Sequence, residues 1–144
     1  MVANNPVSYD GNTAILEGVA SGEIDVGFVN HYYLYRFLAE DPSYPVANHF
    51  FSDGDPGALV NVAGAGVVTH STHPESAQQF LSCLLSAEVQ NYFASTNYEL
   101  PVTNDATPWA DLPTLDSLKL PSFDLNQLAD LQGTVDMLVE VGAL

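Results

Sequence analysis

The junction near residue 30 constrains the fold of this chain more than any other stretch. Residues 24–29 form a short, mainly apolar run of the kind found in strands. After the polar pair Asn30-His31, the pattern over residues 32–40 takes on the period of a helix, and Asp41-Pro42 ends it. A strand that leads directly into a helix is the repeating unit of α/β proteins.

The rest of the chain continues this alternation of helix and strand signals. Further strand signals cover residues 46–51 and 58–68, the second interrupted by Gly64 and Gly66, which indicates one or two strands with a close backbone approach. Residues 95–122 are rich in proline and read as loops. Further helices are predicted over residues 10–22, from a capping box at Thr72–Glu75 onward, over 87–94 and over 124–141. We therefore predict an α/β fold.

The apolar residues of each predicted helix fall on one face, which predicts that this face is buried. Cys83, the only cysteine, lies in such a pattern and is expected to be a small buried hydrophobe. The residues expected to face the core are Ile15, Leu16 and Val19; Ala77, Phe80, Leu81, Leu84 and Leu85; and Leu125, Leu128, Leu131, Val135, Leu138 and Val139.

The charge balance of the chain excludes some classes of partner. The chain has eighteen acidic residues and only two basic residues, Arg36 and Lys119, which gives a formal charge of −16 over 144 residues. Such a chain has no basic patch for phosphates, so nucleic-acid binding is not expected. We expect no membrane span and no signal peptide in the chain as given. No spacing of carboxylates and no nucleophile motif indicates catalysis, so we expect a binding protein and not an enzyme.

Two adjacent tyrosines, Tyr32 and Tyr33, follow the first predicted strand. A phenol loses its proton when it coordinates a hard trivalent cation such as Fe(III), which favours oxygen anions. Consecutive helical residues point about 100° apart, so two adjacent rings can converge on one ion only in a turn or at a helix start. The alternative interpretation is that Tyr32, Tyr33 and Tyr35 are half-buried aromatic residues of an amphipathic helix.

Several segments together resemble a known family. Residues 22–33 read Gly-Glu-Ile-Asp-Val-Gly-Phe-Val-Asn-His-Tyr-Tyr, and residues 54–61 read Gly-Asp-Pro-Gly-Ala-Leu-Val-Asn. With residues 77–81, 86–90 and 138–144, they are similar to the ferric-iron-binding solute-binding proteins of ABC importers. The resemblance covers nearly the whole chain, but only the C-terminal part of a complete family member.

This resemblance implies a class II periplasmic-binding-protein fold, in which two α/β lobes close around the ligand. It implies Fe(III) as the ligand, with Tyr32 and Tyr33 as metal ligands and a synergistic anion, phosphate or carbonate. Asn12 and Asn30 would hold the anion. From the residues alone, Asn12 is equally well a helix N-cap and Asn30 a turn residue.

The resemblance also implies a division of the chain. Residues 1–62 and 114–144 would belong to the second lobe, and residues 63–113 would join the first lobe. The implied partners are an ABC-transporter permease and either the missing N-terminal lobe or a second copy of the chain, in a periplasmic or extracellular location. The alternatives are a binding protein for another anion or metal chelate, and a truncated oligomeric remnant that binds nothing.

Overall fold

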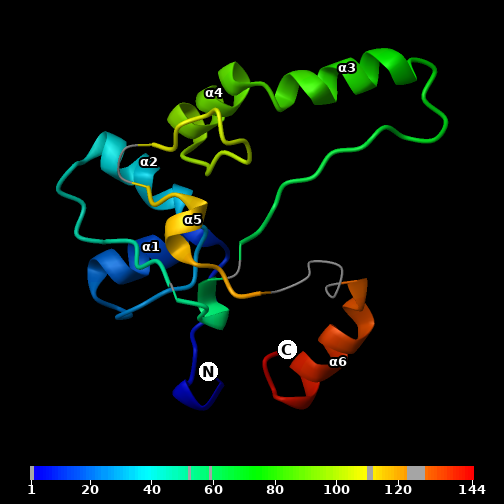
Figure 1. The fold of residues 1–144 in the computed structure, drawn as a ribbon. Helices are drawn as coiled ribbons and strands as arrows, with labels where there is room; N and C mark the ends of the chain where they lie inside the picture. Colours follow the sequence, from blue (N-terminus) through cyan, green and yellow to red (C-terminus); the bar gives the residue numbers. More distant parts are fainter. Residues whose placement is uncertain (1, 52, 59, 110–111, 123–128) are drawn as a thin grey trace. The chain divides into compact units, whose positions relative to one another are not determined.

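The computed structural model describes residues 2–51, 53–58, 60–109, 112–122 and 129–144. The chain divides into two compact units, which are described separately (Figure 1). The first unit combines Met1–Val29 with Ser122–Leu144, and the second is Asn30–Pro121. None of the described helices is long and apolar enough to cross a membrane.

The first unit contains the short 3-10 helix η1 (Val2–Asn4) and the α-helices α1 (Asn12–Ser21) and α6 (Leu131–Glu140). Helix α1 ends at Gly22, whose φ of 77° is a left-handed conformation that favours glycine. The predicted helix over residues 10–22 is therefore confirmed to within two residues.

The extended segment that follows α1 packs back onto the same helix. A Cβ atom at Gly27 would meet the side chain of Ile15, so only glycine fits this approach without a shift. Leu16 is buried, with 2% of its surface exposed. Of the three α1 residues expected to face the core, Leu16 is thus fully buried, while Ile15 and Val19 are half-buried.

The second unit contains α2 (Tyr32–Glu40), η2 (Pro56–Ala58), α3 (Pro74–Leu84), α4 (Ala87–Asn97) and α5 (Leu115–Leu118). Helix α2 has the predicted bounds and buries Leu34 and Tyr35. Helix α4 runs three residues beyond its predicted end, to Asn97. Helix α5 lies in the segment predicted to be loops, and the Thr114 side chain caps it by accepting a hydrogen bond from Ser117 N.

A buried glutamine ties α3, α4 and the following loop together. The Gln90 side-chain amide donates to the Leu84 carbonyl over 2.9 Å, and its Oε1 accepts from Val102 N over 2.9 Å. Asn91 Oδ1 accepts from Thr107 N in the same loop, at 2.8 Å. The proline-rich loop is therefore held by side chains of α4.

The predicted strands are not found among the described residues. Residues 24–29, 46–51 and 60–68 run without secondary structure, and Figure 1 shows the third as a long stretch leading to α3. Gly64 and Gly66 have open space where a Cβ would lie, so the expected close backbone approach is absent there. A strand needs the N–H and C=O groups of a neighbouring strand, and the described part of the chain supplies none to these segments.

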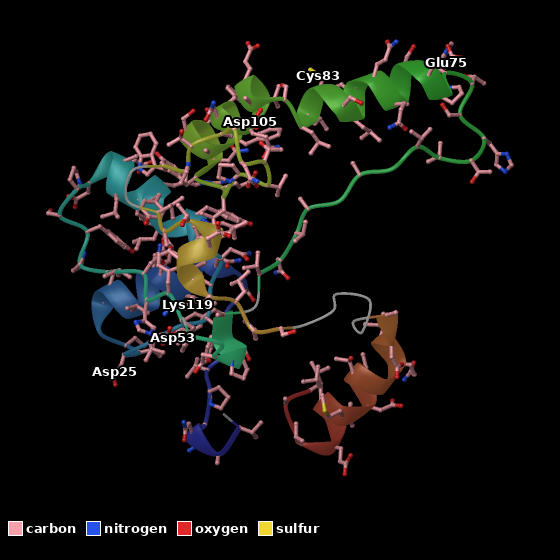
Figure 2. The ribbon with its side chains drawn as sticks, in the orientation of Figure 1. Asp25, Asp53, Glu75, Cys83, Asp105 and Lys119 are labelled. Carbon is pink, nitrogen blue, oxygen red and sulfur yellow. The ribbon has the colours of Figure 1, made fainter. Side chains whose placement is uncertain are left out.

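Two expectations about α3 are wrong. Its N-cap is His73, without a side-chain cap hydrogen bond, because Pro74 takes the first helical position and leaves Thr72 outside the helix. Its apolar face is not buried in the described chain: Phe80 is 63% exposed and Cys83 is exposed (Figure 2). Burial depends on a packing partner, which periodicity does not provide.

Helix α6 also buries no residue. It begins at Leu131, after the N-cap Asp130, whose side chain accepts a hydrogen bond from Gly133 N. The predicted helix start at Asp124 and the expected core residues Leu125 and Leu128 lie outside the described residues.

Candidate functional site

Tyr32 and Tyr33 lie at the start of α2, as predicted for two rings that converge. Tyr32 is the first residue of the helix, after His31, and Tyr33 N donates to the Asn30 carbonyl over 3.2 Å. The two rings stack, with centroids 4.9 Å apart and planes at 29°. Both side chains are half-buried. The two phenols are thus neighbours in space as well as in sequence.

Arg36 lies over both rings, one helical turn later. Its Cζ is 5.7 Å from the centroid of the Tyr32 ring and 5.2 Å from that of the Tyr33 ring. Both distances are within the range of cation–π attraction. The spacings of three and four residues place the three side chains on one face of the helix.

His31 fixes the start of α2 to distant parts of the second unit. Its Nε2 is 2.7 Å from the carbonyl oxygen of Tyr98, the residue that ends α4, and the Asn48 side-chain amide donates to the His31 carbonyl over 3.0 Å. The His31 ring also meets the Tyr32 ring edge-on, with centroids 5.6 Å apart, and lies 5.9 Å from the Phe50 ring. The backbone just before the tyrosine pair is therefore bound to two other segments of the second unit, at Tyr98 and at Asn48.

The third tyrosine of the segment has a packing role. Tyr35 is buried, and its ring stacks on that of Tyr98 at 5.4 Å. Tyr98 in turn meets Trp109 edge-on at 5.5 Å. The alternative interpretation of half-buried aromatic residues of an amphipathic helix thus also fits Tyr32 and Tyr33, while Tyr35 is buried.

The two asparagines lie in different units. Asn30 is an exposed residue just before α2, next to the tyrosine pair. Asn12 is in the first unit, where it is the first residue of α1 and follows the N-cap Gly11. The interpretation of Asn12 as an N-cap is therefore wrong. The second unit brings together Tyr32, Tyr33 and Asn30.

The described residues contain no group of three or more His, Cys, Asp or Glu side chains that could hold a metal ion.

Lys119, the second cationic side chain, forms an ion pair with Asp53 at 2.8 Å (Figure 2). The Lys119 carbonyl also accepts from Gly54 N over 2.9 Å.

Sequence reasoning did not give a role in the site to Arg36 or Tyr98. Arg36 lies three residues after Tyr33 and four after Tyr32, and this spacing predicts that the three side chains share one face of a helix. The contact of His31 with Tyr98 joins residues 67 positions apart, and no local pattern indicates it.

The chain is similar to several known proteins. The family profile described as bacterial extracellular solute-binding protein matches residues 2–91. The Fe(3+)-binding periplasmic protein of Serratia marcescens is 30% identical over 143 residues, which cover 97% of this chain and 42% of that protein. The major ferric iron-binding protein of Neisseria meningitidis serogroup B is 28% identical, over 93% of this chain and 41% of that protein.

A solved structure is also similar. The crystal structure of iron-bound HitA from Pseudomonas aeruginosa matches with a TM-score of 0.83 and 32% identity, over 93% of this chain and 44% of that one. This chain therefore spans about two-fifths of the length of the relatives it matches. The extent of these matches confirms the resemblance noted in the sequence, and the chain belongs to the bacterial extracellular solute-binding protein family.

Proposed function

We propose that this chain takes part in ferric iron binding for uptake by an ABC transporter, with Tyr32 and Tyr33 as phenolate ligands. The observation that carries the proposal is the stacked tyrosine pair at the start of α2, with ring centroids 4.9 Å apart. The relatives named for ferric iron binding and the iron-bound structural neighbour support the choice of metal.

The chemistry of the pair suits a hard trivalent cation. Each phenol that coordinates Fe(III) gives up its proton to solvent and supplies one oxygen anion. Two phenolates occupy only part of the coordination shell of such an ion. A synergistic phosphate or carbonate takes further positions in our proposal, with Asn30 and Asn12 as the predicted anion-binding residues.

The remaining ligands would come from polypeptide that corresponds to the rest of the relatives' length. We propose the predicted division: residues 1–62 and 114–144 in one lobe, and residues 63–113 in the other. The extended segments 24–29, 46–51 and 60–68 would then become strands of α/β lobes by pairing with that polypeptide. In this arrangement the protein binds iron in the periplasm or outside the cell and delivers it to a membrane permease.

The test is a titration of the chain with Fe(III) nitrilotriacetate, followed by visible absorbance, with and without phosphate or carbonate. We expect a phenolate-to-iron charge-transfer band that is lost in Tyr32→Phe and in Tyr33→Phe. Tyr92→Phe is the matched control, because Tyr92 is an exposed tyrosine on α4, and it should keep the band.

Repeating the titration with the complementary polypeptide present separates two failures. A band that appears only with the second polypeptide would mean that this chain holds an incomplete site. The absence of a band in both titrations would contradict the proposal and would leave the tyrosines as packing residues. Binding of phosphate without any band would favour a carrier of anions.

A further inference from the structure

The residue that ends α4 has an unusual backbone. Tyr98 has a φ of 60° and a ψ of 30°, the left-handed conformation in which helices commonly end with glycine. This conformation is unfavourable for a bulky side chain, and residues held in such conformations cluster at functional sites. Among the described non-glycine residues with positive φ, Tyr98 is the only aromatic one.

Three side chains contact Tyr98. Its carbonyl accepts a hydrogen bond from His31 Nε2 over 2.7 Å, because a carbonyl oxygen can only accept. Its ring stacks on that of Tyr35 at 5.4 Å and meets Trp109 edge-on at 5.5 Å. His31 directly precedes Tyr32, and Tyr35 lies in the first turn of the helix that carries the tyrosine pair. Tyr98 therefore binds the start of α2 at two points.

These contacts cross the division of the chain that we propose above. His31 and Tyr35 belong to the proposed lobe that carries the tyrosine pair. Tyr98 and Trp109 lie in residues 63–113, which would join the other lobe. All four residues nevertheless belong to one compact unit of this structure. If the two lobes move apart, these contacts break.

We propose that Tyr98 is a positioning residue for the tyrosine pair, and that its contacts with His31 and Tyr35 form a latch that keeps the two lobes closed. This inference rests on the proposed function, which supplies the lobes and the role of the tyrosine pair. Opening of the lobes would break the hydrogen bond at His31 and free the start of α2. The two proposed ligands would then lose their fixed positions when iron is released.

The first test uses the chain without metal. Amide hydrogen exchange, followed by NMR, measures how often the start of α2 opens. His31→Phe keeps a ring beside Tyr32 but cannot donate to the Tyr98 carbonyl. The amide of Tyr33, which donates to the Asn30 carbonyl, should therefore exchange about 2- to 10-fold faster, the ratio for one lost hydrogen bond.

Two controls make the exchange result specific. Tyr98→Phe keeps the carbonyl and the ring, so it should leave the exchange rate of Tyr33 unchanged. His49→Phe makes the same substitution at a histidine whose ring lies edge-on to Phe51, at 5.1 Å, and should also have no effect. Unchanged exchange of Tyr33 in His31→Phe would overturn the proposal.

The only tryptophan of the chain, Trp109, reports the ring contacts. Tyr98→Gly suits the left-handed backbone and removes the ring, so the end of α4 is kept while the aromatic contacts are lost. We expect the Trp109 fluorescence to shift to longer wavelength as water reaches the indole. Unchanged emission in Tyr98→Gly would show that the ring of Tyr98 does not cover Trp109 and would overturn the latch.

The second test follows the transfer of iron to EDTA from the chain together with its complementary polypeptide, by the loss of the charge-transfer band. His31→Phe and Tyr98→Gly should release iron about 2- to 10-fold faster than the parent. The wavelength of the band should stay the same, because Tyr32 and Tyr33 are unchanged. Loss of folding would instead lower the amplitude of the band.

The outcomes separate this inference from the proposed function. A parent band with unchanged iron release in both variants would overturn the latch and leave the proposed function intact. If the parent shows no band, the proposed function fails, and the amide exchange of Tyr33 still decides whether Tyr98 positions the start of α2.

Discussion

Asp41 ends α2 through a local turn. Its Oδ1 accepts hydrogen bonds from Ser43 N over 2.9 Å and from Ser43 Oγ over 2.6 Å, while Asp41 N donates to the Phe37 carbonyl over 2.7 Å. The two bonds from Ser43 favour the ionised carboxylate and lower the pKa of Asp41, against a smaller opposing effect of desolvation. A single exposed carboxylate thus stabilises the end of the helix that carries the tyrosine pair.

This geometry predicts a pH effect. Because the pKa of Asp41 is lower in the folded chain than in the unfolded chain, its contribution to stability is present above the unfolded pKa and is lost as the pH falls through the folded pKa. Ser43→Ala should raise the pKa of Asp41 towards its ordinary value of 3.8. The measurement is a carbon-detected NMR titration of the carboxyl groups.

Ser95→Ala is the control for this titration, because the Ser95 hydroxyl donates to the Tyr92 carbonyl and not to a carboxylate. It should leave the pKa of Asp41 unchanged. Equal titration midpoints of Asp41 in the parent chain and in Ser43→Ala would show that the turn does not stabilise the charge.

Among single residues, those whose role depends on near neighbours were predicted well. Tyr32 and Tyr33 lie at a helix start, as the junction indicated, because the change from strand to helix pattern is readable over about ten residues. Cys83 was predicted wrongly, since its exposure depends on what covers α3. Asn12 lies one position inside its helix, a difference within the usual uncertainty of helix ends.

At the scale of elements, a serine side chain caps the start of α4. The Ser86 side chain accepts a hydrogen bond from Val89 N and donates one to the Cys83 carbonyl over 2.7 Å. It thus satisfies a free N–H group at the start of α4 and a carbonyl at the end of α3. This one side chain joins the two helices.

Ser86→Ala should therefore lower the free energy of unfolding by about 1 kcal/mol, the usual cost of losing an N-cap. Urea unfolding followed by circular dichroism measures the change. Ser82→Ala is a matched control inside α3, where the hydroxyl donates to the Gln78 carbonyl four residues back. Alanine is the better helix former at such a position, so Ser82→Ala should leave stability equal or slightly higher. Equal losses in both variants would refute the role of Ser86 as a cap.

The accuracy of the sequence-based prediction differs between the helices and the strands. Helices α1 and α2 have nearly the predicted bounds, because glycines, prolines and periodicity act within a few residues. Helix α5 was missed because prolines surround it and its cap, Thr114, lies among loop signals. The predicted strands were wrong for the described residues, because a strand exists only with a partner.

At the scale of the whole molecule, much apolar surface lacks a partner in the described chain. Helices α3 and α6 bury none of their residues. Large exposed apolar surfaces mark interaction sites. The most exposed apolar residues of α3, α6 and the extended segments are Phe80, Leu131, Val139, Val26, Phe28 and Val68.

We expect this chain to bind the polypeptide that corresponds to the rest of the relatives' length, and Phe80→Ser to weaken that complex about 10- to 100-fold. This range is the worth of burying one large apolar side chain, about 1.5–3 kcal/mol. Light scattering coupled to gel filtration measures the complex. Gln79→Ser, which changes the polar neighbour of Phe80 on α3, should have little effect.

Light scattering also distinguishes a complex with the second polypeptide from an oligomer of this chain alone. If the chain self-associates to a mass at least twice its 15.4 kDa and does not bind the second polypeptide, the result would favour an oligomer of this chain alone. A monomer that does not bind the second polypeptide would contradict the prediction.

The amino-acid sequence by itself determined the positions of the main helices, the tyrosine pair at a helix start and the family of the chain. The helices and the place of the tyrosine pair depend on contacts within one or two helical turns, such as those of Tyr32 and Tyr33 with Arg36. Only the tertiary structure decided that Tyr98 holds His31, that Phe80 is exposed and that the extended segments lack partners among the described residues. Burial and strand pairing join residues far apart in the chain, and local patterns carry no information about which distant groups meet.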